Sequence, residues 1–373
     1  MTEIYLIRHT QAEGNIYRVI QGLWDGNVTE NGVRQVQALA ERFREVPIDA
    51  LYSSDLYRTR FTASGITKYH DIEMNLRPAL REVDMGDWEA RFFGDIAVVD
   101  PMGVDAFTHD CDHWVAPGGE SCAQVAARAM SEFNTIAEEN DGKTVAVVSH
   151  GMTIRCILSS ITGTPVREQP IVRNTAVNHL YYDHGKWTVD YVDDISHLSS
   201  IPTPPWQSLP VLSTADYIPF IDDDYYVGCY SEAWKCIHGS LRDFTPSVYL
   251  LAAHRHSKND AHSVMKVYED ARPAGLIDLD TAHGKESGHG WISFLYLNPE
   301  YRFRGAGIQL LARAVMHYRA LGRTALRLNV APENTTAIQF YTKYGFRIVG
   351  EEPGCSGRLL VMEAEIERPR TLL

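Results

Sequence analysis

The stretch IYLIRHTQAEGN, Ile4 to Asn15, decides the fold of the first half of the chain. It opens with a short apolar run, which is typical of a buried β-strand, and the run ends directly in Arg8 and His9. The carboxyl ends of parallel strands form the sheet edge at which α/β proteins bind ligands. The pattern therefore predicts a cation and an imidazole at a ligand-binding edge.

Four later segments add groups of the same chemical kind. SSDLYRTRFTA places Arg58 at the start of a predicted helix, and LREVDMGDWEA contains Glu82 beside a turn. PGGES predicts a turn with Ser121 as a helix cap, and TVAVVSHGM predicts a second buried strand that ends at His150. Taken singly, each residue is better explained without a function: Arg58 as a helix-surface charge, Glu82 as a solvated turn residue and His150 as a buried imidazole bonded to backbone. Their order and their positions at strand ends indicate phosphoryl chemistry.

The residue types fit the handling of a phosphate monoester, which carries about −1.5 to −2 charges near neutral pH. Arg8 and Arg58 offer planar guanidinium groups that match phosphate oxygens. A neutral nitrogen of His9 can attack phosphorus and form a phosphohistidine, with His150 as a further hydrogen-bond donor. Glu82 can protonate the leaving oxygen and later deprotonate water.

Together these segments resemble the histidine phosphatase superfamily, which implies a three-layer α/β domain of the phosphoglycerate mutase-like fold. The resemblance implies that Asn15 contacts the phosphate and that the catalytic residues are Arg8, His9, Arg58, Glu82 and His150. The chain departs from the family pattern at Thr10 and Gln11, where Gly and Glu are usual. REVDMGDWEA is more similar to the α-ribazole phosphatase and broad phosphatase branch than to the mutases, which implies hydrolysis.

Composition limits the classes of protein that the chain can be. A length of 373 residues predicts two domains, and 45% hydrophobic with 22% charged residues is typical of a globular protein. The net charge of −13 and the lack of a Lys/Arg-rich face argue against nucleic acid as a partner. We expect neither a signal peptide nor a membrane span, because no apolar run reaches ~18 residues. The six scattered cysteines predict reduced thiols and a cytoplasmic protein.

The segment FTHDCDHW offers an alternative interpretation as a metal site, through His109, Cys111, Asp112 and His113. Alternation along a strand would point neighbouring side chains to opposite faces, and a second ligand pair at metal-site spacing is missing. We therefore expect no metal, and interpret residues 92–114 as an insert that selects the substrate.

The chain changes character after His197. HLSSIPTPPWQSLPVL is rich in proline, which favours extended backbone and prevents regular helix. We predict a first domain over residues 1–197, a linker over 198–211 and a second domain over 212–373.

The second domain contains LYLNPEYRFRGAGIQLL, a predicted strand followed by a glycine-containing loop and an amphipathic helix. Glycines let backbone N–H groups converge on an anion, and the helix start adds about +0.5 charge. The pattern predicts a pyrophosphate cradle, with an ordinary tight turn as the alternative. A strand, TALRLNV, and a helix, ENTTAIQFYTKYGF, follow it.

This half resembles the GNAT family of N-acetyltransferases, an α+β fold, in its R-x-x-G-x-G loop and its A-x-x-F-Y-x-K-x-G-F helix. The resemblance implies acetyl-CoA as the acetyl donor, Asn334 as a contact of its pantetheine arm and Tyr341 as the acid that protonates the departing thiolate. The residues implied to hold acetyl-CoA are Leu295, Leu297, Arg302, Arg304, Gly305, Ala306 and Gly307. Candidates for the base that activates the amine are Asp278, Asp280 and Glu351.

The sequence thus predicts a bifunctional enzyme, a phosphomonoester hydrolase and an N-acetyltransferase, acting on a small phosphorylated metabolite and a small amine acceptor. A single metabolite that meets both sites is one hypothesis. A phosphatase joined to a non-catalytic, acetyl-CoA-sensing module is the alternative, and the sequence leaves it open. The sequence does not identify the substrate of either domain or the oligomeric state of the protein.

Overall fold

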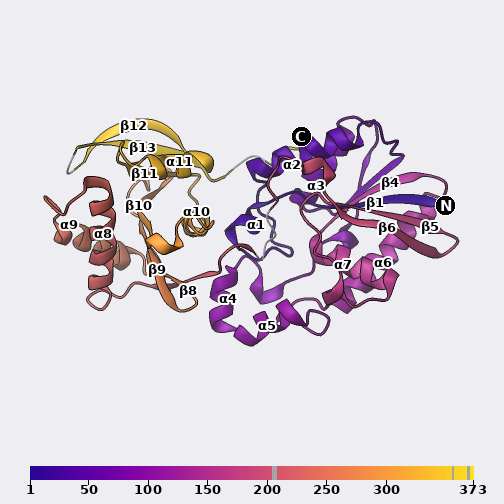
Figure 1. The fold of residues 1–373 in the computed structure, drawn as a ribbon, viewed down its shortest axis with the longest axis horizontal. Helices are drawn as coiled ribbons and strands as arrows, with labels where there is room; N and C mark the ends of the chain where they lie inside the picture. The colour runs from indigo at the N-terminus through magenta and orange to yellow at the C-terminus, as the bar shows by residue number, and fades with distance from the viewer. Residues whose placement is uncertain (204–207, 355–356, 368–369) are drawn as a thin grey trace. The chain divides into compact units, whose positions relative to one another are not determined.

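The computed structural model describes residues 1–203, 208–354, 357–367 and 370–373. Its contacts divide the chain into two compact units, residues 1–208 with 370–373, and residues 209–369 (Figure 1). Part of the predicted linker, residues 204–207, lies outside the described residues, as does Cys355.

The first unit is built on a six-stranded sheet with the strand order β3-β2-β4-β1-β5-β6. The strands are β1 (Thr2–Arg8), β2 (Ala50–Ser53), β3 (Met74–Leu76), β4 (Thr144–Ser149), β5 (Val177–Asp183) and β6 (Lys186–Asp194). The pairs β1–β4, β2–β4 and β2–β3 are parallel, whereas β5 and β6 pair antiparallel. The carboxyl ends of β1, β2 and β4 therefore meet at one edge.

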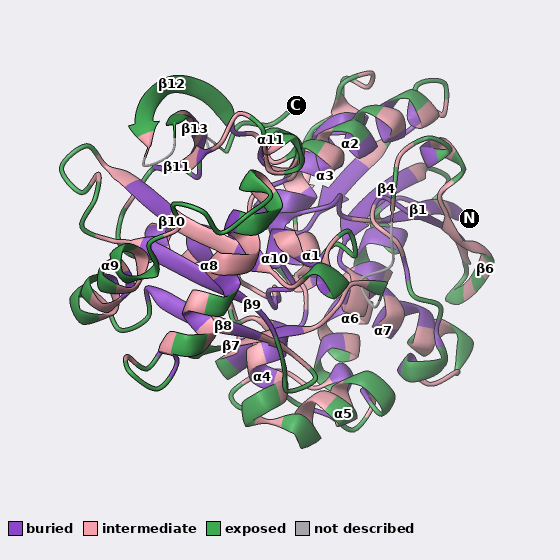
Figure 2. Ribbon diagram, turned by 60° about the vertical axis from the view of Figure 1, so that its left-hand side comes forward, coloured by how far each residue is buried: buried purple, intermediate pink, exposed green. Residues whose placement is uncertain are grey.

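Helices cover both faces of this sheet because its central strands are apolar on both sides. Ile4 and Leu6 of β1 pack with helices α6 (Cys122–Glu139) and α7 (Gly151–Thr162). Ile7 packs on the other face with α2 (Glu30–Phe43) and α3 (Tyr57–Thr67). Figure 2 shows the central strands β1 and β4 as largely buried and the outer helix faces as exposed. The predicted three-layer α/β domain is confirmed.

Local sequence sets the helix starts. Ser121 caps α6 and forms a reciprocal capping box with Gln124, as the PGGES pattern predicted, and Thr29 caps α2. The remaining helical elements of this unit are α1 (Glu13–Tyr17), η1 (Pro78–Leu80), η2 (Gly86–Trp88), α4 (Phe93–Val99), α5 (Pro101–His109), η3 (Val166–Glu168) and η4 (Ser196–Leu198).

The second unit contains a seven-stranded sheet with the order β12-β13-β11-β10-β9-β8-β7. The strands are β7 (Leu212–Asp216), β8 (Val264–Glu269), β9 (Arg272–Asp280), β10 (His289–Leu297), β11 (Ala325–Val330), β12 (Arg347–Gly354) and β13 (Gly357–Glu365). Among the described strands of this sheet, β10 and β11 pair in parallel and the other neighbours pair antiparallel.

The helices of this unit pack against that sheet, which lies between α8 and α9 on one side and α10 on the other in Figure 1. The helical elements are α8 (Asp223–His238), α9 (Pro246–Asn259), η6 (Pro299–Tyr301), α10 (Gly307–Ala320) and α11 (Thr335–Lys343). Gly290 lets α10 approach closely, since a Cβ there would lie 2.3 Å from the ring of Tyr318. The predicted α+β class of the second domain is confirmed. Within the described residues, no helix combines the length and apolarity that a membrane span needs.

Candidate functional site

The ends of β1 and β4 bring two histidines together. These strands are parallel neighbours, with Arg8 opposite Ser149, and His9 N donates to the Ser149 carbonyl at 2.9 Å. His150 follows Ser149 directly, so the centres of the His9 and His150 rings lie 5.2 Å apart. Parallel pairing thus places at one sheet edge two imidazoles that are 141 positions apart in the chain.

His9 is held with a free lone pair on Nε2. Its Nδ1 lies 2.7 Å from the carbonyl oxygen of Thr10, which can only accept, so Nδ1 carries the proton. The side chain is 2% exposed. Burial and the charges of Arg58 and Arg8 hold the pKa of His9 well below the usual histidine range, although the bond to Thr10 opposes this. Nε2 is therefore an unprotonated nitrogen at neutral pH.

Arg8 lies at the end of β1, and its Nη1 donates to the carbonyl of Val172 at 2.5 Å. Gly151 leaves room for the guanidinium, because a Cβ at that position would come within 3.3 Å of Arg8 Nε. Burial lowers the pKa of Arg8 from its ordinary value, and the charge of Glu82 opposes this. The glycine after His150 thus lets the arginine pack against the start of α7 without displacement.

Arg58 is the second residue of α3 and is fully buried. Its Nη1 donates to Asp25 Oδ1 and to the Trp24 carbonyl, both at 3.1 Å, and its Nη2 donates to the Gly22 carbonyl at 2.7 Å. Burial lowers the pKa of Arg58, while Asp25 and Glu82 act in the opposite direction. The loop around Asp25 therefore fixes the guanidinium from one side.

His150 begins α7 and is oriented by Ser54, whose Oγ lies 2.9 Å from His150 Nε2. Ser54 Oγ also accepts from Leu56 N at 3.5 Å. A hydroxyl proton donated from Ser54 to Nε2 would place the imidazole proton on Nδ1. Burial, Arg58 and His9 hold the pKa of His150 well below the usual range, so the imidazole is neutral.

Three buried nitrogens around His9 find no hydrogen-bond acceptor among the described residues: Arg8 Nε, Arg58 Nε and His150 Nδ1. Buried donors without a partner are costly, and a cluster of them at a ligand-binding edge indicates a missing acceptor. Two of the three belong to guanidinium groups, so the acceptor that fits is an anion with several oxygens.

Glu82 lies between η1 and η2, against the first turn of α7. Its carboxylate oxygens accept from Val83 N at 3.0 Å, from Met152 N and Thr153 N at 3.1 Å each, and from Thr153 Oγ1 at 3.2 Å. Arg128 fixes the main chain here, since its Nη2 donates to the Glu82 carbonyl at 2.9 Å. The structure thus brings Glu82 to the helix that His150 begins.

Asn15 lies in α1, and its side-chain oxygen accepts from Ala12 N at 2.9 Å and from Asn174 Nδ2 at 3.4 Å. Asn174 Nδ2 also donates to the His9 carbonyl at 3.0 Å. The oxygen of Asn15 is therefore used within the loop, so a ligand contact of this side chain would come from its amide nitrogen.

Thr10 and Gln11, the two residues that depart from the family pattern, take part in a network of polar contacts. Thr10 Oγ1 donates to the Gly32 carbonyl at 2.7 Å, and Thr10 N donates to Thr62 Oγ1 at 2.8 Å. Gln11 Oε1 accepts from Thr29 Oγ1 at 2.8 Å. Neither residue has a positive φ, so this turn does not need the glycine that is usual there.

In the second unit, a strained loop precedes α10. Phe303 has φ 60° and Gly305 has φ 79°. No side chain of the described residues caps the first N–H groups of α10, although Gln309 N donates to the Ala306 carbonyl at 3.0 Å. Both arginines of the loop have carboxylate partners: Arg302 Nη2 lies 2.8 Å from Glu232, and Arg304 Nη1 lies 3.1 Å from Glu269.

Beside this loop, β10 and β11 pair only from His289 to Ile292 on β10. The pairing of β10 with β9 has an irregularity at Ile292/Phe294 and then continues to Leu297. The stretch with Leu295 and Leu297 is thus paired on one side, toward β9, and an extended amide chain could pair on the other.

The two polar residues predicted on α11 are placed at its ends. Asn334 is the N-cap, and its Oδ1 accepts from Ala337 N at 3.2 Å. Tyr341 is buried between Phe340 and Phe346, with ring centres 5.2 and 5.3 Å away. Burial raises the pKa of Tyr341, so its hydroxyl stays protonated.

Family models and known proteins similar to this chain are consistent with this arrangement of histidine and arginine side chains. The model of the histidine phosphatase superfamily (branch 1) matches residues 4–195. Probable phosphoglycerate mutase GpmB of Proteus mirabilis is 31% identical over 208 residues, covering 54% of this chain and 97% of that protein. The same protein of Cronobacter sakazakii is 31% identical over 207 residues, covering 54% and 96%.

The chain belongs to the histidine phosphatase superfamily.

A solved structure supports the same assignment, since YhfR of Bacillus stearothermophilus is 29% identical with a TM-score of 0.52, covering 53% of this chain and all of that one. The model of the acetyltransferase (GNAT) family matches residues 225–346. The chain therefore joins a histidine phosphatase domain to a GNAT acetyltransferase domain.

The candidate bases of the acetyltransferase domain prove to be engaged in ion pairs. His256 Nδ1 lies 2.6 Å from Asp278, and its Nε2 lies 3.2 Å from Asp280. Burial lowers the pKa of His256, but the hydrogen bonds and charges of the two carboxylates outweigh it and raise the pKa to about 9. The hydrogen bond from His256 lowers the pKa of Asp280 to about 2. A protonated His256 thus lies between Asp278 and Asp280, in contact with both.

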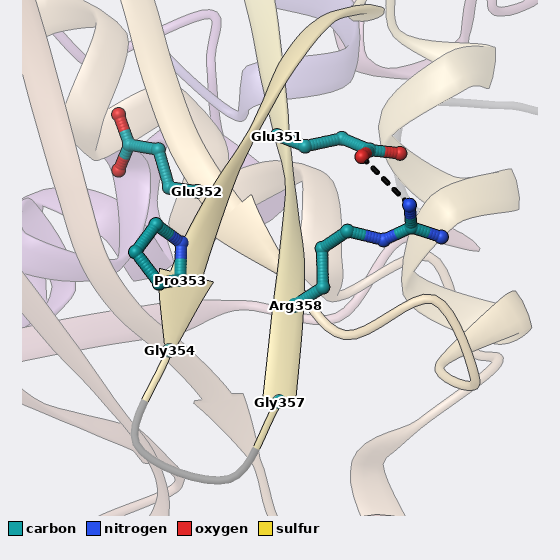
Figure 3. A pocket seen from close by; sticks show the side chains of 6 residues that line it. All are labelled: Glu351, Glu352, Pro353, Gly354, Gly357 and Arg358. Atoms are coloured by element: carbon teal, nitrogen blue, oxygen red, sulfur yellow. Dashed lines mark ion pairs between the residues drawn. The ribbon is translucent and has the colours of Figure 1, made fainter.

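Glu351 lies on β12 and is 2.9 Å from Arg358 of β13. Figure 3 shows the two side chains facing each other across a surface hollow on this hairpin. The hollow is lined by Glu351, Glu352, Pro353, Gly354, Gly357 and Arg358.

The insert over residues 92–114 folds against the phosphatase domain through aromatic contacts. The rings of Phe107 and Trp114 lie 6.0 and 4.8 Å from that of Trp88. Its histidines have local partners, with His109 bound to Asp105 and His113 bound to Asp110. Among the described residues, no group of three or more His, Cys, Asp or Glu side chains is placed to hold a metal ion.

Several supporting residues escaped the sequence analysis, namely Asp25, Ser54, Arg128, Val172 and Asn174. Each of these residues contacts a partner that is distant in the chain, so no sequence motif of fixed spacing contains both partners. A polar partner for His150 and one for Arg58 could have been expected, because a buried histidine and a buried arginine each need one, but the sequence does not indicate that Ser54 and Asp25 supply them.

Proposed function

We propose that the phosphatase domain hydrolyses phosphate monoesters through a phosphohistidine on His9, and that the acetyltransferase domain moves an acetyl group from acetyl-CoA to a small amine. The observation that supports the first activity is the set of three buried N–H groups without an acceptor, around the free Nε2 lone pair of His9. A phosphoryl group at that place would satisfy all three donors and lie beside the nucleophile.

In the first step, His9 Nε2 attacks phosphorus, the N–P bond forms and the bond from phosphorus to the ester oxygen breaks. Glu82 would give a proton to the leaving oxygen, which departs as an alcohol. Arg8 and Arg58 neutralise the phosphoryl oxygens throughout, since their Nε donors are buried and aimed by fixed partners.

In the second step, a water molecule attacks the phosphohistidine while the Glu82 carboxylate accepts its proton. The N–P bond breaks, the electron pair returns to His9 Nε2 and inorganic phosphate leaves. The tautomer of His9 stays the same through the cycle, because Nδ1 donates to the Thr10 carbonyl at each stage.

A panel of phosphorylated metabolites and p-nitrophenyl phosphate, read as released phosphate, tests this proposal. We expect turnover in the wild type, loss of it in His9→Ala, and an acid-labile, alkali-stable phosphoenzyme in rapid-quench experiments. His184→Ala is the matched control, since His184 is an exposed histidine of the same unit. Equal phosphate release by His9→Ala and the wild type would refute the nucleophile.

The names of the relatives favour a second candidate, phosphoryl transfer between hydroxyls of one sugar acid. Two relatives at 31% identity are named probable phosphoglycerate mutase. The same phosphohistidine would then be attacked by a substrate hydroxyl instead of water. Incubation with 3-phosphoglycerate separates the two, because phosphorus NMR shows inorganic phosphate for hydrolysis and 2-phosphoglycerate for mutase activity.

Three features support acetyl-CoA as the ligand of the second domain: the positive-φ loop, the uncapped start of α10 and the one-sided pairing of β10 beyond Ile292. Acetyl-CoA supplies an activated thioester. The N–H groups of Gly305 to Gly307 would hold its pyrophosphate, since Arg302 and Arg304 are already paired with carboxylates. Leu295 and Leu297 would pair with the pantetheine amides. Tyr341 would hold a proton for the thiolate, beside Asn334 as a further contact.

Calorimetry with acetyl-CoA and a thiol-release assay on a panel of small amines test this half. Binding with thiol release supports acetyl transfer. Binding without release for any amine, together with a phosphatase rate that changes on addition of acetyl-CoA, would favour the sensing module instead.

A further inference from the structure

The segment Arg370–Leu373 follows the acetyltransferase domain in sequence but packs on the phosphatase domain. Tyr57 Oη donates to the Thr371 carbonyl at 3.1 Å, and Leu373 N donates to Ser64 Oγ at 3.0 Å. Both partners belong to α3, the helix that carries Arg58. In Figure 1 the label of this chain end lies beside α2 and α3.

The first residue of this segment meets the partner of Arg58. Arg370 Nη1 lies 3.5 Å from Asp25 Oδ2, and Arg370 Nη2 donates to the main-chain oxygen of Asp25. Asp25 Oδ1 accepts from Arg58 Nη1 at 3.1 Å. One carboxylate is therefore shared between a buried arginine, 0% exposed, and a half-exposed one, 50% exposed.

This sharing matters because the loop around Asp25 determines where Arg58 points. The guanidinium donates to the carbonyls of Gly22 and Trp24 as well as to the carboxylate, so its outer nitrogens are fixed by this one loop. Its remaining donor, Nε, is one of the three buried nitrogens without a partner among the described residues, which the proposed function assigns to the phosphoryl group. A shift of the loop would move that donor away from its acceptor.

Arg370 holds the same loop from the solvent side, at both the carboxylate and the main chain of Asp25. The guanidinium also lies over the ring of Tyr57, 5.3 Å from its centre, and Tyr57 N donates to Asp25 Oδ2. The backbone before Arg58, the loop and the segment thus form one connected set of contacts.

We propose that Arg370 is a positioning residue of the phosphoryl site, so that a segment beyond the acetyltransferase domain completes the support of the phosphatase domain. The inference rests on the proposed phosphatase function. It predicts that loss of Arg370 weakens phosphate binding more than it changes the chemical step, because Arg370 acts on the aim of Arg58 and touches no reacting atom.

The test compares Arg370→Ala with the wild type in the full-length chain, using orthovanadate affinity by calorimetry and the KM and kcat for p-nitrophenyl phosphate. We expect vanadate affinity to fall and KM to rise by about 2- to 5-fold, as for a partly exposed ion pair, with kcat little changed. Arg370→Lys should restore part of the loss. The difference between wild type and variant should shrink at 0.5 M salt, because exposed charges are screened.

Thr371→Ala is the matched control, since Tyr57 contacts the main-chain carbonyl at that position and the exposed side chain is dispensable. Unchanged vanadate affinity and KM in Arg370→Ala, with hydrolysis intact in the wild type, would overturn this inference alone. If the wild type bound vanadate but hydrolysed nothing, the proposed function would fail while the affinity comparison still decided the role of Arg370. If the wild type did not bind vanadate, both would fail.

Discussion

Ser54→Ala probes the tautomer of His150 without touching a charged group. Ser54 Oγ lies 2.9 Å from His150 Nε2, and both side chains are fully buried. We predict that a hydroxyl proton donated to Nε2 keeps the imidazole proton on Nδ1, the buried atom of this ring that has no hydrogen-bond partner among the described residues. Without it, nothing on the Nε2 side favours that tautomer.

The size of the effect follows from the contact that is lost. A hydrogen bond to a charged acceptor contributes about 1.5–3 kcal/mol, which corresponds to about 10- to 160-fold in affinity. The buried hydroxyl bond itself contributes about 1 kcal/mol to stability, and for a domain of this size that is a shift in Tm of about 2–4 °C. Ligand affinity should therefore fall much more than stability.

Ser53→Ala is the control, because the neighbouring hydroxyl is equally buried but donates to the Ser54 carbonyl at 2.8 Å and not to a histidine. Thermal unfolding should show similar small decreases in Tm for both variants. Calorimetry should show a loss of orthovanadate affinity in Ser54→Ala alone. Equal vanadate affinity in the two variants would show that Ser54 does not set the tautomer of His150.

Three further predictions concern the proton donor, the acetyl-CoA loop and pH. Glu82→Gln should slow an alkyl phosphate far more than p-nitrophenyl phosphate, whose phenolate needs little protonation, and equal losses would remove Glu82 as the acid. Gly305→Val should abolish acetyl-CoA binding in calorimetry, because a side chain at φ 79° is strained and fills the loop, whereas Tyr341→Phe should bind normally and lose acetyl transfer by up to ~10²–10⁴. In the folded protein, the pKa values of His9 and His150 lie well below the ~6.5 of histidine in the unfolded chain, so unfolding takes up protons at acid pH. The free energy of unfolding that these neutral histidines contribute is fully present above about pH 6.5 and is lost as the pH falls below that value. Thermal unfolding measured between pH 7.5 and 5 should show Tm falling with pH. The dependence of Tm on pH should be weaker in His9→Gln, and an equal dependence in the variant and the wild type would contradict this prediction.

Local sequence was enough for the elements and for the residues that carry chemistry at their ends. The apolar runs before His9 and His150 predicted β1 and β4, because strands buried on both faces need uninterrupted apolar residues. The glycine-containing loop predicted the start of α10 in the same way. Each of these signals lies within a few neighbouring residues, where backbone preference and burial act directly.

Tertiary structure alone decided which groups support those residues. The contacts of Ser54 with His150 and of Asp25 with Arg58 join residues 96 and 33 positions apart. Arg370 reaches Asp25 across 345 positions, after the whole acetyltransferase domain. Such partners are set by the packing of elements and by the need of each buried charge or imidazole for a polar contact, and many sequences can meet that need from different positions. The sequence by itself thus predicted His9 as the nucleophile, Arg8 and Arg58 as the cations and the loop before α10 as the anion-binding loop, while the fold decided which buried nitrogens have no partner and which segment returns to the first domain.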